Sequence, residues 1–531
     1  MNRELYGTCV SCRLEAAAAE RPDKVAIDFE GATLTFGELR RRSSLGAARL
    51  RAAGIGRGDV VVTAGYNSLD YVVLFFACLA SGAVWAPLNV ALTDSEVLEH
   101  VRHLGPAMLL ASEEFAAHAG RVDDELGVRT ARIETVVAPG ADSVAPLEAH
   151  EHVRGSDTAW IIFSGATTGR PKAIELPASW SVASTQRAMD AIELAESDVI
   201  YSVLQMYHAW QSLHVLVAGV TVRCTIAMRR WFSASRWISD ARRVGATIVD
   251  PLTPMISAIL AQPPRKSDAD NRIRMSINAV TDGTPRSIAN RIAYHERFGL
   301  SSVNIYGLTE AGALVAFDVQ LGSEPNLGMR PSDDYEVKVA DEDGWPCEPG
   351  VVGEIHVRPR YPGLIAKGYR SDAGRTVAAW RDLWIHTGDR AKIEPDGELR
   401  FVGRDAFWIR RRGENLSAIE VEGVVRDFPG VAEAAVVGID GELGEQDVMA
   451  FLEPVPGQEL DLDELHAYVR TRLAYFKVPR FYQVVEALPR TAKGDVMRHK
   501  LTKNDARVWD AGVGYTPSGT RERVRASKPN P

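Results

Sequence analysis

The sequence predicts an α/β fold with more than one domain, and three observations support this prediction. The chain has 531 residues, which is too long for one compact domain and suggests two to four. Apolar strands alternate with helices in residues 34–88 and again in 244–305, a pattern typical of mainly parallel sheets. From about residue 334 the pattern becomes antiparallel β, and a smaller α/β unit follows Arg404.

The first part of the chain shows the strand and helix alternation directly. Residues 34–52 indicate a strand end and an amphipathic helix, and the following GDVVVTAG indicates a buried strand. Residues 71–88, YVVLFFACLASGAVWAPL, approach the length of a short membrane span. Because Ser81-Gly82 and Pro87 interrupt this run, we interpret it as a buried helix, a turn and a buried strand. Residues 244–260 indicate a strand, a proline turn and a helix.

The second part of the chain has a different texture. The segment YEVKVADEDGWPCEPGVVGEIHVRP alternates apolar and polar residues around DEDG and EPG turns, which predicts antiparallel strands, and residues 396–403 predict one more. The smaller α/β unit has a helix around 462–473. The tail from about Trp509 is rich in Gly, Ser, Pro and Arg, and we expect it to be disordered.

Composition excludes several classes of protein. Hydrophobic residues make up 46% and charged residues 25%, as in ordinary globular proteins, and the net charge of -9 argues against nucleic acid as a partner. The five cysteines form no disulfide framework, and the CxxC of Cys9 and Cys12 has no second pair to complete a zinc site. The N-terminus lacks the apolar core of a signal peptide, so we expect a cytoplasmic protein without a membrane span. A serine hydrolase is excluded, since no G-x-S-x-G elbow has a partnered histidine.

The strongest sign of chemistry is the loop FSGATTGRPK, residues 163–172, which follows an apolar strand end. Small residues allow a backbone to wrap closely around phosphates, while hydroxyls and a lysine supply donors and charge. The pattern differs from the GxxxxGK[ST] loop of P-loop enzymes. The residues expected to contact phosphate are Ser164, Thr167, Thr168, Gly169 and Lys172.

With further motifs in the same order, this loop resembles the adenylate-forming superfamily of acyl-CoA synthetases, peptide-synthetase adenylation domains and luciferases. The similarity covers essentially residues 10–501 and is greatest to the carnitine- and fatty-acid-CoA ligase branch. The other matching segments are 34–61, Gly82–Asn89, Tyr306–Glu310 (YGLTE), Asp382–Asp389 (DLWIHTGD), Gly403-Arg404, Arg412–Glu422 (RGENLSAIEVE), Phe476–Pro479 and Leu488–Thr491.

The resemblance implies a detailed domain organisation. Residues 1–403 would form a large N-terminal domain of two mixed, mainly parallel sheets with helices, including a β-barrel-like subdomain at about 334–403. A hinge at 404–406 and a small mobile α+β lid domain at 407–508 would follow, and residues 509–531 would be a disordered tail. In this family the small domain rotates between the two half-reactions.

The resemblance also implies ATP and Mg²⁺ as ligands, with CoA as the expected acceptor. Tyr306, followed by Gly307, would stack on adenine, although a lone tyrosine at a strand end is by default a core residue. Asp389 and Arg404 would bind the ribose, Thr309 the α-phosphate and Glu310 the Mg²⁺, a cation that prefers carboxylate oxygens. The opposite wall of the adenine site would be Gly283, Thr284 and Pro285.

The acid substrate would bind beside the adenylate. His208 lies where the family has an aromatic–histidine pair between the substrate and thiol channels, while a lone histidine is more often structural. The expected pocket residues are Trp210, Gln211, Ala311, Gly312 and Ala313. The small residues of this set would leave room for a substrate that Trp210 caps, which favours a flat or short acid.

The C-terminal motifs depart from the family at three positions. Asp495 replaces the lysine that bridges nucleophile and α-phosphate, and loss of one such donor typically costs about 10²–10³ in rate. Lys493 lies two residues earlier, roughly 6.5 Å away on the same side of an extended segment, and is a candidate replacement. Arg412 stands where the family has a glycine beside the pantetheine tunnel, where it would crowd the tunnel, reach an anion or form a solvated basic edge. Ala406 replaces a polar hinge residue.

Three functions remain open from the sequence. The first is an acid–CoA ligase. The second is an adenylating enzyme with an amine acceptor, such as one that activates nitrite for diazotisation of an arylamine. The third is a non-catalytic nucleotide-binding homologue, against which the intact Thr309, Glu310, Asp389 and Arg404 argue. Neither the substrate nor the oligomeric state can be predicted.

Overall fold

The computed structural model describes residues 9–140, 153–164, 172–279, 285–320, 328–404, 408–441, 445–490, 496–503 and 507–512. At 279, 285–288, 313–314, 319–320, 403–404, 408, 415 and 499 the description covers the backbone only. The chain divides into two compact units. The first unit comprises Met1–Val90, Val97–Phe163 and Ala173–Gly403, and the second comprises Ala91–Glu96, Ser164–Lys172 and Arg404–Pro531.

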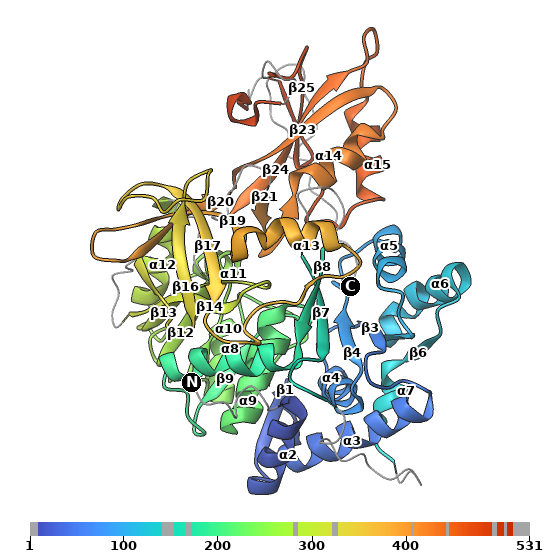
Figure 1. Cartoon of the computed structure of the whole chain (residues 1–531), viewed down its shortest axis with the longest axis vertical. Helices are drawn as coiled ribbons and strands as arrows, with labels where there is room; N and C mark the ends of the chain where they lie inside the picture. Colours follow the sequence, from blue (N-terminus) through green and yellow to red (C-terminus); the bar gives the residue numbers. More distant parts are fainter. Residues whose placement is uncertain are drawn as a thin grey trace. The chain divides into compact units, whose positions relative to one another are not determined.

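A seven-stranded sheet forms one layer of the first unit (Figure 1). Its central strands pair in parallel, as the βαβ pattern predicts, and only the β18 edge pairs antiparallel with β8 among the pairs described. In sheet order the strands are β18 (Gly368–Tyr369), β8 (Lys172–Pro177), β7 (Thr158–Ser164), β4 (Val84–Pro87), β3 (Val60–Ala64), β5 (Met108–Ala111) and β6 (Thr130–Arg132).

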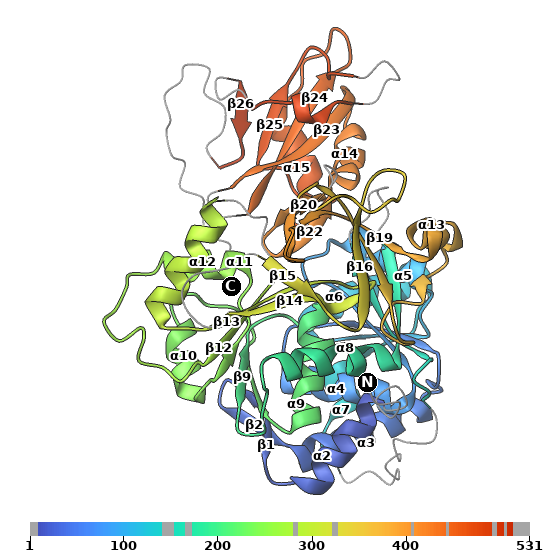
Figure 2. The same ribbon diagram turned by 60° about the vertical axis from the view of Figure 1, so that its left-hand side comes forward.

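A second sheet of thirteen strands continues through the first unit, and Figure 2 shows its strands β12 to β15 side by side. Strands β1, β10, β9, β11, β12 and β13 pair in parallel, and both ends of the sheet are antiparallel. In sheet order the strands are β16 (Tyr335–Ala340), β17 (Gly353–Pro359), β19 (Ile385–Ile393), β20 (Leu399–Arg404), β15 (Gly328–Pro331), β14 (Gly312–Gln320), β13 (Ser302–Leu308), β12 (Met275–Ala279), β11 (Ile248–Val249), β9 (Val199–Ser202), β10 (Thr225–Met228), β1 (Val25–Phe29) and β2 (Ala32–Thr35).

Helices cover the faces of these two sheets, and α3 and α4 lie side by side. The helix predicted in residues 71–88 is α4, which Ser68 caps at its start and Gly82 ends at φ +82°, a conformation that glycine tolerates. The helices of this unit are α2 (Val10–Glu20), α3 (Phe36–Ala52), α4 (Leu69–Ser81), α5 (Asp94–Leu104), α6 (Ala116–Leu126), α7 (Ile133–Val137), α8 (Ala178–Ala191), α9 (Leu216–Val222), α10 (Trp237–Val244), α11 (Thr253–Leu260), α12 (Pro285–Phe298) and α13 (Ala373–Ala379).

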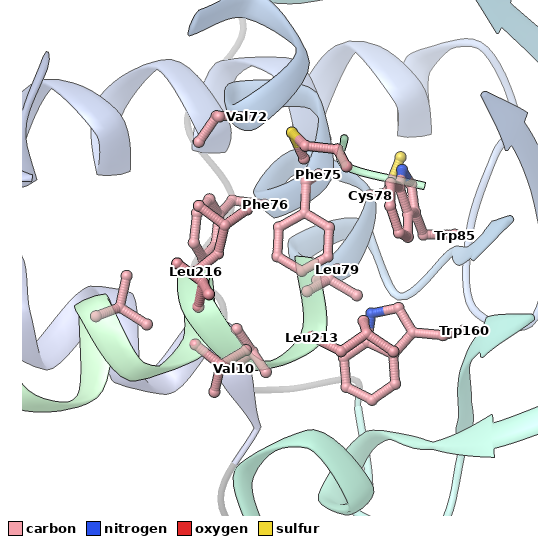
Figure 3. Packing of buried hydrophobic residues seen from close by; sticks show 14 of the residues in the cluster. Val10, Val72, Phe75, Phe76, Cys78, Leu79, Trp85, Trp160, Leu213 and Leu216 are labelled. Atoms are coloured by element: carbon pink, nitrogen blue, oxygen red, sulfur yellow. The ribbon is translucent and has the colours of Figure 1, made fainter. Parts of the chain in front are cut away.

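The largest hydrophobic core of the first unit lies where α4 meets the sheets. Figure 3 shows Phe75 between Phe76 and Trp85, with Trp160 and Leu213 below it, and all five side chains are buried. Phe75 meets Trp85 edge-on at a centroid distance of 5.1 Å, the arrangement that aromatic pairs prefer. Burial on nearly every face explains why α4 is as apolar as a short membrane span.

The region at about 334–403 departs in one respect from the expected β-barrel-like subdomain. Its strands β16, β17, β19 and β20 form antiparallel extensions of the thirteen-stranded sheet. In the described residues the sheet is open, because β16 ends it and pairs only with β17. The alternation of apolar and polar residues predicted the antiparallel pairing, but such a pattern does not indicate whether a sheet closes into a barrel.

The second unit contains a four-stranded sheet and a two-stranded hairpin. The helices α14 and α15 pack against a core of its own, which includes Val421, Leu465 and Trp509. The strands and helices are β21 (Trp408–Arg411), β22 (Glu414–Ser417), α14 (Ala418–Arg426), β23 (Val431–Asp440), β24 (Gln446–Pro454), α15 (Leu462–Arg470), β25 (Phe481–Val484) and β26 (Val508–Asp510).

The start of the expected disordered tail needs correction. Residues 508–510 form β26, which pairs with β25, and Trp509 is only 4% exposed in the core of the second unit. Apolar burial of one tryptophan therefore orders a segment whose composition is otherwise typical of disorder. Residues 513–531 lie outside the described residues.

In the part of the chain that the structure describes, no helix combines the length and apolar character needed to cross a bilayer.

Candidate functional site

The sequence-predicted ribose ligand Asp389 lies beside the predicted adenine residue Tyr306 in the first unit. Tyr306 belongs to β13 and Asp389 to β19, and the Tyr306 hydroxyl donates a 2.8 Å hydrogen bond to Asp389 Oδ2. Asp389 is fully buried and Tyr306 is 4% exposed, packed within a hydrophobic cluster that includes Met329. The two residues thus lie together in the first unit, and each satisfies a polar group of the other.

Glu354 holds the irregular part of β19 that carries Asp389. Its Oε1 accepts the N–H of Gly388 at 2.8 Å, and Gly388 has φ +70°, which favours glycine. Thr387 Oγ1 donates to the carbonyl of Ile355 at 2.7 Å and accepts the N–H of Asp389 at 3.1 Å. The backbone around Asp389 is therefore fixed before any ligand binds.

Two histidines share the other oxygen of Glu354. His356 Nε2 lies 3.2 Å and His386 Nδ1 3.4 Å from Glu354 Oε2. Burial alone would raise the pKa of Glu354, but hydrogen bonds from His356 and Gly388 and the charge of the histidines lower it to about 2. Burial lowers the pKa of His386. Glu354 is therefore an anion over the whole physiological pH range.

The predicted phosphate and metal residues lie at the turn between β13 and β14. Glu310 Oε1 accepts a 3.0 Å hydrogen bond from the hydroxyl of Tyr369, and Thr309 is half-buried beside it. Ala311 is fully buried, and the space beside Gly312 (φ +97°) is filled, because a Cβ there would lie 2.5 Å from the Tyr335 hydroxyl. The small residues at 311 and 312 thus make room for the protein's own packing, which differs from the expected pocket.

The predicted substrate residues Trp210 and Gln211 begin a π-helical segment, η2 (Trp210–Val215). In this segment Leu216 N–H donates to the carbonyl of Gln211, and such π-turns often occur at functional sites. The half-buried His208 precedes it and stacks on Tyr207 at 5.2 Å. Gln211 is fully buried, whereas Trp210 is half-buried.

Asp250 is a buried acid next to this segment that the sequence did not single out. Its Oδ2 accepts hydrogen bonds from Ser202 Oγ at 2.8 Å and from Trp210 Nε1 at 2.9 Å. Burial raises the pKa of Asp250 to about 6, although the two hydrogen bonds act in the opposite direction. A pKa near neutrality in a buried group is common at functional sites.

In the second unit, the three arginines at 410–412 have different environments. Arg411 is buried and donates to the carbonyls of Phe476 and Val478 at 3.3 and 2.6 Å. Arg412 is exposed, has φ +56° and lies 5.0 Å from the ring centre of Tyr475, which is itself 59% exposed. The run is therefore more than a solvated basic edge, since Arg411 is structural.

Several predicted residues border the described segments or lie outside them. Ser164 ends β7 and Lys172 begins β8, so they flank the phosphate loop. Arg404 ends β20 and Pro285 begins α12, with only their backbones described, and Gly307 lies within β13. The predicted residues that lie outside the description are Thr167, Thr168, Gly169, Gly283, Thr284, Lys493, Asp495, Ala406 and the side chain of Ala313.

Sequence reasoning missed Glu354, Ser202 and Asp250. The one available signal was an acidic residue at the carboxyl end of an apolar strand, in the segment ATIVDP. Glu354 had no such signal, because its role depends on the pairing of β17 with β19.

Comparisons with known proteins agree with the fold and the motifs. The family model of the AMP-binding enzyme matches residues 14–370, and that of the AMP-binding enzyme C-terminal domain matches residues 420–495. A feruloyl-CoA synthase from an Amycolatopsis species is 30% identical over 488 residues, covering 91% of this chain and 96% of the relative.

Two solved structures show the same fold. A double mutant of o-succinylbenzoate CoA synthetase from Bacillus subtilis, bound with a product analogue, has a TM-score of 0.82 at 24% identity, covering 93% of this chain and 98% of that one. The amide bond synthetase McbA from Marinactinospora thermotolerans has a TM-score of 0.81 at 23% identity, covering 93% of this chain and 99% of that one.

Proposed function

Because the chain belongs to the AMP-binding enzyme family, we propose that it activates a small carboxylic acid as its acyl adenylate and transfers the acyl group to CoA. Membership makes the protein an AMP-forming ligase of the adenylate-forming class. The proposal adds the substrate class and the acceptor. Its main support is the buried Asp389, held by hydrogen bonds within β19 beside Tyr306 in the first unit.

The chemistry of Asp389 fits a ribose. Its carboxylate already accepts a hydrogen bond from the hydroxyl of Tyr306. The ribose 2′- and 3′-hydroxyls are donors of the same kind. In the proposal, nucleotide binding exchanges this bond for bonds to ribose and frees Tyr306 to contact adenine. By the family resemblance, Arg404, Ser164 and Lys172 are further candidates for nucleotide contacts.

Glu310 fits a magnesium ligand, since its carboxylate is half-buried and one oxygen is oriented by Tyr369. When bound, Mg²⁺ would neutralise charge on the phosphate oxygens. In the first half-reaction the substrate carboxylate attacks the α-phosphorus, a P–O bond to the acid forms, and pyrophosphate leaves. In the second, the CoA thiolate attacks the acyl carbon and AMP leaves. Thr309 and His208 would position the reactants, which is the main contribution of a protein to such transfers.

One observation favours a second acceptor, an amine. Arg412 adopts the left-handed conformation that is costly for any residue with a Cβ, and it presents its guanidinium next to the exposed Tyr475. By the family resemblance, a glycine is expected at this position, beside the tunnel for pantetheine. A ligase that does not use CoA would have no need of that tunnel.

The test is ATP- and Mg²⁺-dependent pyrophosphate release over short aliphatic and aromatic acids and nitrite, each with and without CoA or an arylamine. We expect release with an acid and a CoA thioester when CoA is present. Release without use of CoA, with an amide or a diazotised arylamine as product, would establish the second acceptor. No release from any substrate, with ATP still bound, would contradict both and support a non-catalytic homologue.

A further inference from the structure

Asp250 and Ser202 lie at the same edge of the thirteen-stranded sheet. Strands β9 and β11 pair in parallel with Tyr201 opposite Val249. Ser202 is the last residue of β9, and Asp250 directly follows β11. Ligands of open α/β sheets bind at the carboxyl ends of strands. The pair is therefore placed where a substrate is expected, although it belongs to none of the motifs described above.

Four side chains form one buried polar network at this edge. Ser202 and Trp210 both donate to Asp250 Oδ2, and Ser202 Oγ also contacts Gln211 Oε1. Ser202 and Gln211 are fully buried, and Asp250 is 4% exposed. Within the described residues, Asp250 Oδ1 and Gln211 Nε2 are buried atoms without a hydrogen-bond partner. An unsatisfied buried polar atom is costly, so two in one network call for a ligand.

The proton count shows what kind of ligand fits. Ser202 has one hydroxyl proton, which cannot be donated to Asp250 Oδ2 and Gln211 Oε1 at the same time. Turning the Gln211 amide by 180° exchanges its oxygen and nitrogen, so that Ser202 no longer has to donate one proton to two acceptors. The amide then donates to Ser202 Oγ, and Ser202 donates to the carboxylate. The atoms left without partners become two acceptors, Asp250 Oδ1 and Gln211 Oε1.

Two acceptors match a group that has two N–H donors, such as the amino group of an arylamine. A carboxylate or phosphate would be repelled by Asp250, and a methyl group would leave both acceptors unsatisfied. Trp210 is the one partly exposed member of these four residues, and its indole Nε1 donates to the buried acid. A flat aromatic ring can pack on an indole of this kind.

We infer that Asp250, at the carboxyl end of β11, and Gln211, in η2, bind the amino group of an aromatic substrate. This inference rests on the proposed function and specifies its substrate class. The amino group can belong to the acid itself or to a separate arylamine acceptor, and the experiment distinguishes these two sources.

The test measures pyrophosphate release with 3- and 4-aminobenzoate and 3- and 4-aminocinnamate, each compared with its methyl counterpart of similar size. We expect at least one amino-substituted acid to have a kcat/KM about 10²-fold above that of its methyl counterpart. The reason is that a site built for N–H donors rejects analogues that lack them. Asp250→Asn should reduce this ratio by about tenfold or more, because the amide offers a weaker acceptor. Thr185→Val removes a buried hydroxyl from the neighbouring His214 and should keep the ratio.

A second arm uses the methyl acids with free aniline. Here the amine nitrogen bonds to the acyl carbon, the bond to AMP breaks, and the displaced proton passes to solvent. Anilide formation that Asp250→Asn abolishes would show that the amine is the acceptor. Equal use of amino and methyl acids together with no anilide would overturn the inference and mean that the network holds only water. If the amino and methyl acids are used equally and pyrophosphate is still released, the proposed function stands and only the inference fails. If no acid gives pyrophosphate, the proposed function itself is contradicted.

Discussion

Replacing Asp250 with asparagine should make the stability of the protein less dependent on pH. Burial raises the pKa of Asp250 from 3.8 to about 6 in the folded protein. A raised folded pKa stabilises the fold when the group is protonated, and this contribution is lost as the pH rises through about 6. The ionised carboxylate therefore costs the folded state about 3 kcal/mol above pH 7, at 1.36 kcal/mol for each pKa unit.

The measurable part of this cost lies between pH 5 and pH 8. At pH 5, one unit below the folded pKa of Asp250, most of this carboxyl is protonated, and the folded protein is about 1.4 kcal/mol more stable than at pH 8 on account of this group. Asparagine cannot ionise, so the free energy of unfolding of Asp250→Asn minus that of the wild type should increase by about 1.4 kcal/mol from pH 5 to pH 8. Any packing cost of the amide is the same at each pH and cancels in this comparison.

The assay is urea unfolding followed by circular dichroism at pH 5, 6, 7 and 8, without ligands. Asp198→Asn is the matched control, because the hydrogen-bonded Arg274 lowers the pKa of Asp198 although burial acts in the opposite direction. Stability that depends on a lowered pKa is lost only below pH 4, so the Asp198→Asn difference should be flat from pH 5 to 8. A flat difference for Asp250→Asn as well would refute the reasoning about burial of this carboxylate.

Four further outcomes can be measured with the same protein. Glu354→Ala should raise the KM for ATP by about tenfold with a smaller effect on kcat, because the Gly388 N–H loses its acceptor; an unchanged KM would contradict the role of Glu354. Tyr306→Phe keeps the ring and removes the donor to Asp389, so ATP binding measured by calorimetry should change by less than tenfold, and complete loss would show that the hydroxyl itself binds the nucleotide. Arg412→Gly should raise stability by about 1 kcal/mol by relieving the left-handed backbone and should raise kcat/KM for CoA, whereas a decrease in overall activity would show that the guanidinium contacts a substrate. Lys493→Ala should lower the rate of adenylation about 10²-fold if this lysine replaces the one absent at Asp495, and an unchanged rate would end that hypothesis.

The sequence predicted local elements well, because their signals lie within a few residues. The α/β class, the buried apolar helix α4, its end at Ser81-Gly82 and the antiparallel pair of β16 and β17 are all confirmed. The hydrogen bond between Tyr306 and Asp389 was not predicted, because the two residues are 83 positions apart and the family motifs indicate only a separate nucleotide contact for each.

The contacts that were not predicted depend on which distant strands pair with one another, and a single sequence carries no signal for that. Ser202 and Asp250 come together because β9 and β11 are neighbours in the sheet, although 48 positions separate them. Gly312 looked like open space, but the distant Tyr335 fills it. Trp509 looked like part of a disordered tail until its burial in the second unit was known.

The most direct measurement is AMP and pyrophosphate formation from ATP, Mg²⁺ and the panel of amino and methyl aromatic acids, with and without CoA. We expect stoichiometric AMP and pyrophosphate with an amino-substituted acid, and an acyl-CoA thioester when CoA is added. ATP that binds without yielding pyrophosphate from any acid or nitrite would contradict the proposal that this chain is an active adenylate-forming ligase.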